Sequence, residues 1–202
     1  TTLWLFGSLC SSASVGFYVQ VAHRIGAGEL VHARHILRQS FLSCLLFASA
    51  LSVIGILICS RLPHWLGGGE DICHDASLYF FIFSLGIPFA QLNSLCSGML
   101  RCSGNMHIPS ILNILMCLLD VVFNYFLIFP SRSFGDWTIP GAGLGVVGAG
   151  LGTLFSFAIC SLIMCWFVCA RSKELNLLQD SGTFIPQRDT LKRAVRLSLP
   201  LA

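Results

Sequence analysis

The stretch that decides the fold is IPSILNILMCLLDVVFNYFLIF, residues 108–129. Its 22 residues include a single charged side chain, Asp120. The hydrocarbon core of a bilayer is about 30 Å thick, and about 20 apolar residues in an α-helix cross it. We therefore predict a transmembrane helix here, with a carboxyl group near its middle.

Comparable runs without any Asp, Glu, Lys or Arg occur on both sides of this stretch. They cover residues 1–22, 39–60, 76–100 and 142–170. With 108–129 they predict five spans, and hence an all-α integral membrane protein built as a polytopic helix bundle. Between the last two spans, 130–140 is predicted to be a loop.

After the five predicted spans the chain becomes polar and then apolar again. The five spans define a membrane domain over residues 1–170, and a polar connector follows at 171–190. In the last segment, LKRAVRLSLPLA at 191–202, basic residues precede an apolar run. This pattern predicts the first turns of a further span. The chain does not begin with Met, so we expect a piece of a longer protein.

The composition excludes several classes of protein. Apolar residues make up 55% and charged residues only 10% of the chain, and the mean hydropathy is +0.79. Soluble domains carry about 25% charged residues. The formal net charge of +3, without a basic cluster, argues against a nucleic-acid partner. No catalytic motif stands out, so we expect neither an enzyme nor a cofactor.

The distribution of basic residues predicts the orientation. Twelve Lys and Arg are present, and only Arg61 and Arg132 fall on one side of the predicted spans. Lys and Arg concentrate in cytoplasmic loops. The sequence thus predicts a multi-pass protein of the cell (inner or plasma) membrane, with the Thr1 end outside and the 171–190 connector in the cytoplasm. The ten residues on the cytoplasmic side are Arg24, Arg34, Arg38, Arg101, Arg171, Lys173, Arg188, Lys192, Arg193 and Arg196.

The ten cysteines do not indicate a disulfide scaffold or a zinc site. Most lie within apolar runs, where cysteine usually serves as a small apolar side chain. No two cysteines have CxxC spacing, so a structural zinc site has little support.

Asp120 is the strongest functional signal. A charge at the bilayer centre costs at least about 2.5–3.5 kcal/mol on insertion scales, so this carboxylate must face protein or water. It could take up a proton or bind a cation, and both roles suit ion coupling. Asn113 and Asn124 share its helix face, because the spacings are 7 and 4 residues. The alternative is that these groups only hydrogen-bond between helices.

Glycine and proline add two further predictions. Small residues four apart let membrane helices pack closely, and Gly141 with Gly145, and Gly148 with Gly152, fit that pattern in the last span. Pro88 lies inside the third span, where it removes a helical hydrogen bond and predicts a kink. Thr153 follows the glycines, and from spacing alone it is expected to bond its own backbone.

Four blocks of sequence, in this order, resemble the MATE family of multidrug and toxic compound extrusion transporters. They are RIGAGE at 24–29, LGIPFAQLNSLCSGMLRCSGNMHIPS at 85–110, LDVVFNYFLIF at 119–129 and GAGLGVVGAGLGT at 141–153. The resemblance implies twelve spans in two six-helix lobes around a central cavity. The five spans correspond to helices two to six of the N-terminal lobe, and 191–202 to the start of helix seven. Helix one and the C-terminal lobe would then be missing partners.

The resemblance also implies a coupling site. The family's N-lobe cation site combines an Asp of helix one, an Asn and an Asp one turn apart on helix five, and a Thr on helix six. Here the helix-five pair is Asp120 and Asn124, in reversed order, which leaves the coordination and the ion open. Thr153 falls at the family's Thr position. Asn113 is a candidate for the cavity wall. No metal beyond Na⁺ is implied.

The resemblance thus implies a secondary antiporter that exchanges Na⁺ or H⁺ for drugs or other organic, often cationic, compounds, with the lipid bilayer and a small organic substrate as its partners. Two alternatives stay open. One is a flippase of lipid-linked saccharides from the same superfamily, which would be expected to have a more cationic cavity. The other is an inactive membrane fragment or scaffold.

Overall fold

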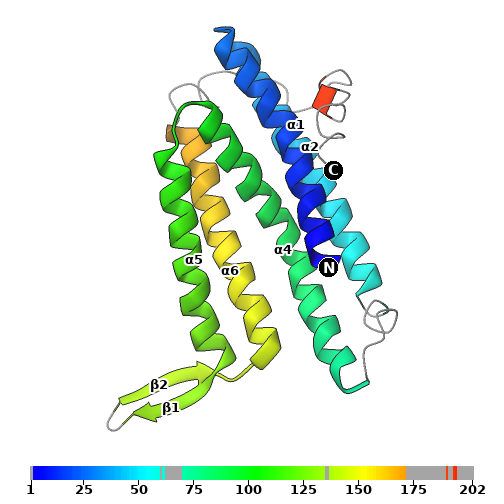
Figure 1. Cartoon of the computed structure of the whole chain (residues 1–202), viewed down its shortest axis with the longest axis vertical. Helices are drawn as coiled ribbons and strands as arrows, with labels where there is room; N and C mark the ends of the chain where they lie inside the picture. Colours follow the sequence, from blue (N-terminus) through cyan, green and yellow to red (C-terminus); the bar gives the residue numbers. More distant parts are fainter. Residues whose placement is uncertain are drawn as a thin grey trace.

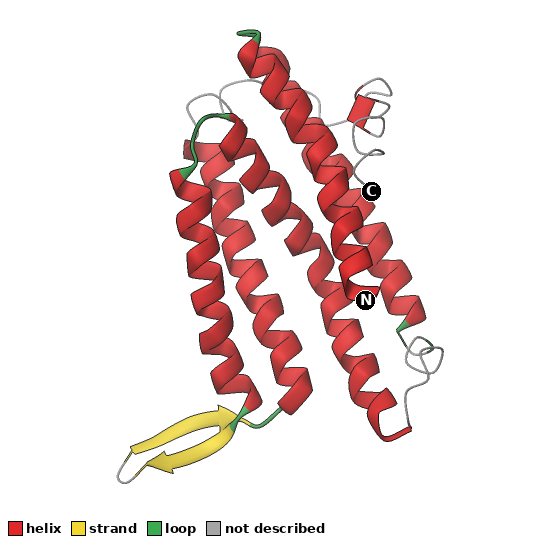
Figure 2. Ribbon diagram, viewed as in Figure 1, coloured by secondary structure: helices red, strands yellow, loops and turns green. Residues whose placement is uncertain are grey.

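The computed structural model describes residues 2–59, 61, 70–134, 137–171, 190 and 193–194, with side chains described from residue 7 onward except at 70–74, 131–140 and 171. Within this part of the chain five long helices follow one another. They are α1 (Thr2–Gly26), α2 (Leu30–Ile58), α4 (Glu70–Cys102), α5 (His107–Ile128) and α6 (Gly145–Trp166), and a π-helical turn, η1 (Phe167–Arg171), continues α6 (Figures 1 and 2).

The helices extend beyond the charge-free runs on which the spans were predicted. The predicted run at 39–60 belongs to α2, which begins at Leu30 and so includes Arg34 and Arg38. Likewise α4 begins at Glu70, before the predicted 76. Charged side chains are tolerated in the first turns of a membrane helix because they can reach the interface, whereas Arg38 is buried within the bundle. Charge-free runs therefore underestimate helix length.

Glycine ends two of the helices. Gly28 has φ +75° after α1, and Gly104 has φ +78° after α4. Glycine adopts this left-handed conformation without steric cost, which is why it commonly terminates helices. The chain then turns back through backbone hydrogen bonds, from Glu29 N–H to the Arg24 carbonyl and from Asn105 N–H to the Leu100 carbonyl, each 3.0 Å.

The predicted loop at 130–140 is instead a β-hairpin. Strand β1 (Pro130–Phe134) pairs antiparallel with β2 (Trp137–Ala142), and Phe134 pairs with Trp137. The hairpin projects from one end of the α5–α6 pair (Figure 2). The loop prediction was wrong at this connection, because paired strands satisfy the backbone groups that an open loop would leave to solvent. The last helix accordingly starts at Gly145 and not at 142.

Helix α4 joins two antiparallel pairs, α1 with α2 and α5 with α6. It packs against α1, α2 and α6, whereas α5 packs chiefly against α6. Figure 1 shows α4 crossing obliquely between the two pairs. Buried side chains from α1, α2, α4, α5, α6 and η1 form one apolar cluster: Phe17, Val21, Ala33, Leu37, Cys44, Leu95, Cys96, Met99, Leu100, Leu112, Met164 and Val168.

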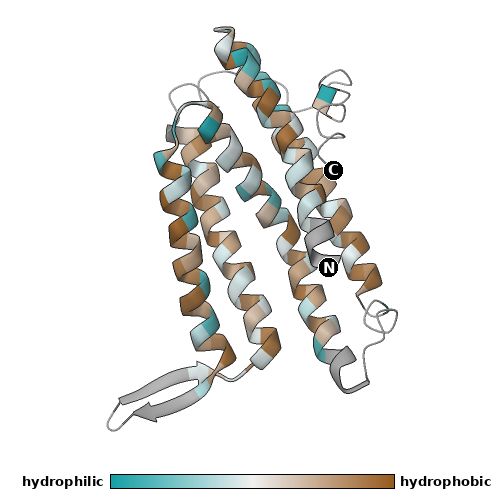
Figure 3. Cartoon of the chain, in the orientation of Figure 1, coloured by the Kyte–Doolittle hydropathy of each residue, from teal (hydrophilic) through white to brown (hydrophobic). Residues whose placement is uncertain are grey.

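The outside of the bundle is apolar as well. Ile111, Ile114, Leu118 and Val121 of α5 are each 59–67% exposed, and Figure 3 shows hydrophobic colour along the outer sides of the helices. Such a continuous apolar surface suits lipid or further helices and does not suit water. By length and composition, four of the described helical segments could cross a membrane: Leu30–Ile58, Asp75–Cys102, His107–Ile128 and Gly145–Ala170.

Two predicted segments fall wholly or partly outside this description. The first predicted span, 1–22, corresponds to α1, whose first five side chains lie outside the described residues. Of the connector at 171–190 and the predicted further span at 191–202, only Arg171, Thr190, Arg193 and Ala194 are described. Ala194 lies against α1, since a Cβ on Gly16 would meet the backbone of Ala194. The boundaries of these segments stay predictions.

Candidate coupling site and substrate groove

The carboxyl and amide groups of α5 are half-buried within the bundle. Asp120 and Asn124, one helical turn apart, each have a buried side-chain oxygen (Oδ1) with no hydrogen-bond partner among the described residues. Buried polar atoms are nearly always paired. An unpaired carboxyl or amide oxygen can accept a hydrogen bond from a donor or coordinate a hard cation. These two oxygen atoms are therefore the candidates in α5 for binding a cation or a hydrogen-bond donor.

Glycines of α6 bring that helix unusually close to α5. A Cβ on Gly148 would lie 2.5 Å from the Leu127 carbonyl oxygen, and one on Gly152 would collide with Oδ1 of Asn124. The predicted close packing at Gly148 and Gly152 is thus present. The prediction for Gly141 with Gly145 was wrong, because Gly141 lies in β2 and only Gly145 belongs to the helix.

The contacts between α5 and α6 fix their register. Leu127 faces Gly148, Asn124 faces Gly152, and the rings of Phe123 and Phe155 are 6.2 Å apart. Continuing this antiparallel register by one turn brings Asp120 to the level of Ser156. Ser156 is 1% exposed, and its hydroxyl donates to the Gly152 carbonyl at 2.9 Å. The acidic side chain therefore lies opposite a buried polar group of α6.

Thr153 belongs to a different part of the structure from Asp120 and Asn124. Its hydroxyl donates to the Ala149 carbonyl at 3.1 Å, as expected for a threonine in a membrane helix. It lines a pocket of about 100 Å³ between α1, α4 and α6. No hydrogen bond within the described part of the chain joins it to the two α5 side chains. Its neighbour Gly152, however, touches Asn124.

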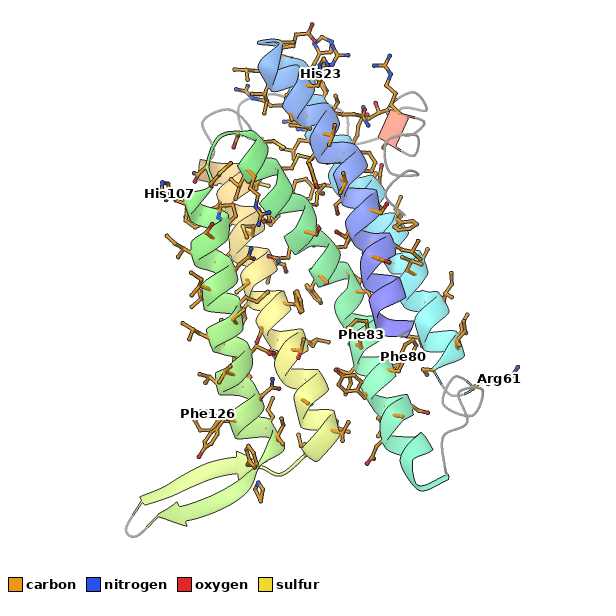
Figure 4. All side chains as sticks on the ribbon, in the orientation of Figure 1. His23, Arg61, Phe80, Phe83, His107 and Phe126 are labelled. Carbon is orange, nitrogen blue, oxygen red and sulfur yellow. The ribbon has the colours of Figure 1, made fainter. Side chains whose placement is uncertain are left out.

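A more polar cavity of about 400 Å³ adjoins that pocket. The two pockets share Ser11, Ala90, Ser94 and Phe157 in their walls, so they adjoin one another along α1, α4 and α6. We refer to the two together as the groove. Figure 4 shows Phe83, which lines the apolar end, on the lower part of α4. The predicted cavity residue Asn113 lines the polar end.

Sequence analysis did not single out the polar residues of α4 that line this groove. Asn93, Ser94 and Ser97 all contribute to its wall, and Oδ1 of Asn93 is buried without a partner among the described residues. Their spacing of three and four residues places Asn93, Ser94 and Ser97 on one side of the helix. That spacing is the signal that could have revealed them before the structure.

Pro88 lies inside α4, which continues on both sides of it from Glu70 to Cys102. Proline has no N–H to donate to the carbonyl of Ser84, four residues earlier. The Ser84 hydroxyl donates to the Phe80 carbonyl at 2.8 Å, in the same turn of the helix. The kink that the sequence predicts at Pro88 stays a prediction.

Comparison with known proteins now gives the family. The sequence profile described as MatE matches residues 1–126. The chain belongs to the MatE family. The predicted resemblance to MATE transporters is therefore confirmed.

Curated relatives of this MatE chain carry transporter names. It is 25% identical over 202 residues to a probable multidrug resistance protein NorM of Thermotoga maritima, covering 98% of this chain and 41% of the relative. It is 22% identical over 187 residues to the multidrug export protein MepA of Staphylococcus saprophyticus, covering 92% of this chain and 38% of the relative. The MatE chain thus spans about two fifths of the length of these relatives.

Solved structures share its fold. The inward-facing and the outward-facing conformations of a multidrug resistance MATE family transporter of the MOP superfamily each match with a TM-score of 0.82 and 23% identity. Each match covers 98% of this chain, and 43% and 42% of the two structures. These likenesses confirm the fold, a polytopic helical bundle. The family and the four described helical segments long and apolar enough to cross a membrane support a multi-pass membrane protein.

Proposed function

We propose that this chain supplies most of the N-terminal lobe of a secondary antiporter, which exports organic, often cationic, compounds in exchange for Na⁺ or H⁺. Membership of the MatE family and the transporter names of its relatives support the general activity. The observation that carries the coupling mechanism is the pair of unpartnered oxygens at Asp120 and Asn124. An ion or proton bound there would satisfy both.

Coupling requires that the ion favours one conformation over another. The Asn124 amide is held against Gly152, so a ligand that moves this amide also acts on α6. Thr153, the next residue, lines the substrate groove. In this proposal Asp120 and Asn124 bind the ion, and Thr153 links their site to the groove through α6.

The lining of the groove supports an amphiphilic cation as substrate. Its apolar end carries the aromatic rings of Tyr79, Phe83 and Phe157, whose faces attract cations. Its polar end carries the side chains of Asn93 and Ser94, among others. Arg101 is the single Lys or Arg among the described residues lining the groove, which does not favour the diphosphate of a lipid-linked saccharide.

The proposed orientation follows from the ends of the bundle. His23 and His107 lie at one end, and Arg61 lies toward the other (Figure 4). Arg24 and Arg101 lie in the last turns of α1 and α4, at the same end as His23 and His107. The excess of Lys and Arg in cytoplasmic loops supports placing that end in the cytoplasm of the cell membrane.

The test is Asp120→Asn in the full-length protein, reconstituted in liposomes and supplied with a fluorescent organic cation. We expect gradient-driven efflux to be abolished while substrate binding without a gradient persists. Asp75→Asn is the matched control, because Asp75 is exposed near the start of α4. Imposing Na⁺ and H⁺ gradients separately identifies the ion. Efflux by Asp120→Asn at the wild-type rate would refute the coupling role.

A further inference from the structure

Sulfur atoms gather where α4 meets the junction of α6 and η1, away from the groove and the α5 oxygens. Sγ of Cys165 on α6 and Sγ of Cys169 on η1 are 3.9 Å apart. Cys96 of α4 belongs to the buried cluster against which Cys165 packs. Each of these cysteines has a free thiol. Two thiols at the junction of α6 and η1 thus lie close together, and a third, from α4, belongs to the cluster beside them. The apolar setting of the individual cysteines in the sequence did not reveal this arrangement.

The surroundings of these thiols are apolar and rich in sulfur. Cys96, Met99 and Met164 have no exposed surface, and Cys165 packs against the same buried cluster. Cys165 and Cys169 themselves are half-buried, so they remain accessible from one side. Thiolates and thioethers select soft metal ions and not hard cations such as Na⁺ or Mg²⁺. The ligand class is therefore a thiophilic metal ion.

The arrangement restricts the ion further. Within the described part of the chain, no three His, Cys, Asp or Glu side chains converge as a metal cage, so a tetrahedral zinc site is excluded there. Burying net charge in apolar surroundings is costly. The complex of a divalent ion with two thiolates has no net charge, whereas the complex of a monovalent ion with two thiolates carries one negative charge.

We propose that Cys165 and Cys169, with Cys96 alongside, form a two-coordinate site for a bare thiophilic divalent ion of the mercuric type. On binding, each of the two thiols releases its proton to water and forms one metal–sulfur bond, so no oxidant is needed. The site crosses the junction between α6 and the π-helical turn η1, a kind of irregularity that often occurs at functional sites.

The experiment uses Hg²⁺ as the probe and the complete chain purified in detergent. Hg²⁺ is added in equimolar amount together with a large excess of a monothiol, which removes ions held by single cysteines. After gel filtration, bound mercury is counted by elemental analysis, and the mercury–thiolate band is recorded in the ultraviolet. We expect one ion per chain. Cys165→Ala and Cys169→Ala should each lower the affinity by about 100-fold or more, because the second thiol acts at high effective concentration.

Cys59→Ala is the matched control, because Cys59 caps α2 and lies outside the thiol cluster; it should retain one ion. Helical circular dichroism and a monodisperse gel-filtration peak establish that each variant is folded. Cys165→Val offers a second substitution if the alanine variant fails to fold. Retention of the ion by folded Cys165 or Cys169 variants, or failure of the wild type to hold one ion against the monothiol, would overturn the proposal.

Discussion

The close approach of α5 and α6 can be tested by adding a single methyl group. In Gly148→Ala the new Cβ would lie 2.5 Å from the Leu127 carbonyl oxygen and 2.7 Å from its carbon. Both atoms belong to the backbone of α5, so no side-chain rotation can relieve the contact. Ordinary contacts begin near 3.4 Å, which means that the helices would have to separate locally by about 0.9 Å, an overpacking of the kind described for well-packed cores.

The magnitude follows from two opposing effects. Overpacking costs about 1–3 kcal/mol, and replacing glycine by alanine within a helix returns about 1 kcal/mol at most. We therefore expect a net destabilisation of about 0.5–2 kcal/mol. Gly86→Ala is the matched control: Gly86 is also buried in a helix, but a Cβ there meets nothing within 4 Å. It should keep or raise stability.

The assay is thermal unfolding of both variants in the same detergent, followed by the loss of helical circular dichroism. A change of 1 kcal/mol shifts the melting temperature of a soluble chain of this size by about 2–4 °C, so the two variants should be clearly separated. If Gly148→Ala melts at or above the temperature of Gly86→Ala, the proposed backbone contact between the helices is wrong.

Three further predictions use the same unfolding measurement. Gln91→Leu should change the free energy of unfolding by less than about 1 kcal/mol, because it removes a buried carbonyl oxygen that has no partner among the described residues, together with one 3.0 Å hydrogen bond to Ser14; a loss of several kcal/mol would contradict this reading. Glu29→Gln removes a largely exposed ion pair with Arg24 and should cost less than about 1 kcal/mol, with a difference that disappears at high salt. Thr153→Val should leave stability within about 0.5 kcal/mol, since its hydroxyl bonds only its own helix, yet it should reduce efflux; unchanged efflux would remove Thr153 from the proposed mechanism.

Much of the architecture could be predicted because helix formation in a membrane depends on local sequence. An apolar run long enough to cross the bilayer must satisfy its backbone groups internally, so it forms a helix wherever it occurs. The run at 108–129 accordingly differs by one residue at each end from α5, His107–Ile128. The hairpin β1–β2 could not be predicted in this way, since strand pairing depends on two segments meeting and not on one segment's composition.

The candidate site likewise has features that the sequence predicted and features that only the structure showed. The spacing of Asp120 and Asn124 indicated a shared helix face, and the glycine pattern indicated close packing of the last helix. Only the tertiary structure showed that Asn124 is the residue that Gly152 touches, and that Thr153 lines a separate groove. Contacts between helices depend on which helix faces pack against each other. The periodicity of one helix shows which residues share a face, but it does not show which other helix that face contacts.

By itself, the sequence determined the membrane class, the number and approximate extent of the long helices, the intramembrane acid and the family, because each depends on local composition or on a motif in one segment. The tertiary structure alone decided the hairpin, the pairing of α5 with α6, the groove shared by α1, α4 and α6 and the packing of Cys165 against the buried cluster that contains Cys96. These last features join residues that are far apart in the chain, and only the packing of one helix against another brings such residues together.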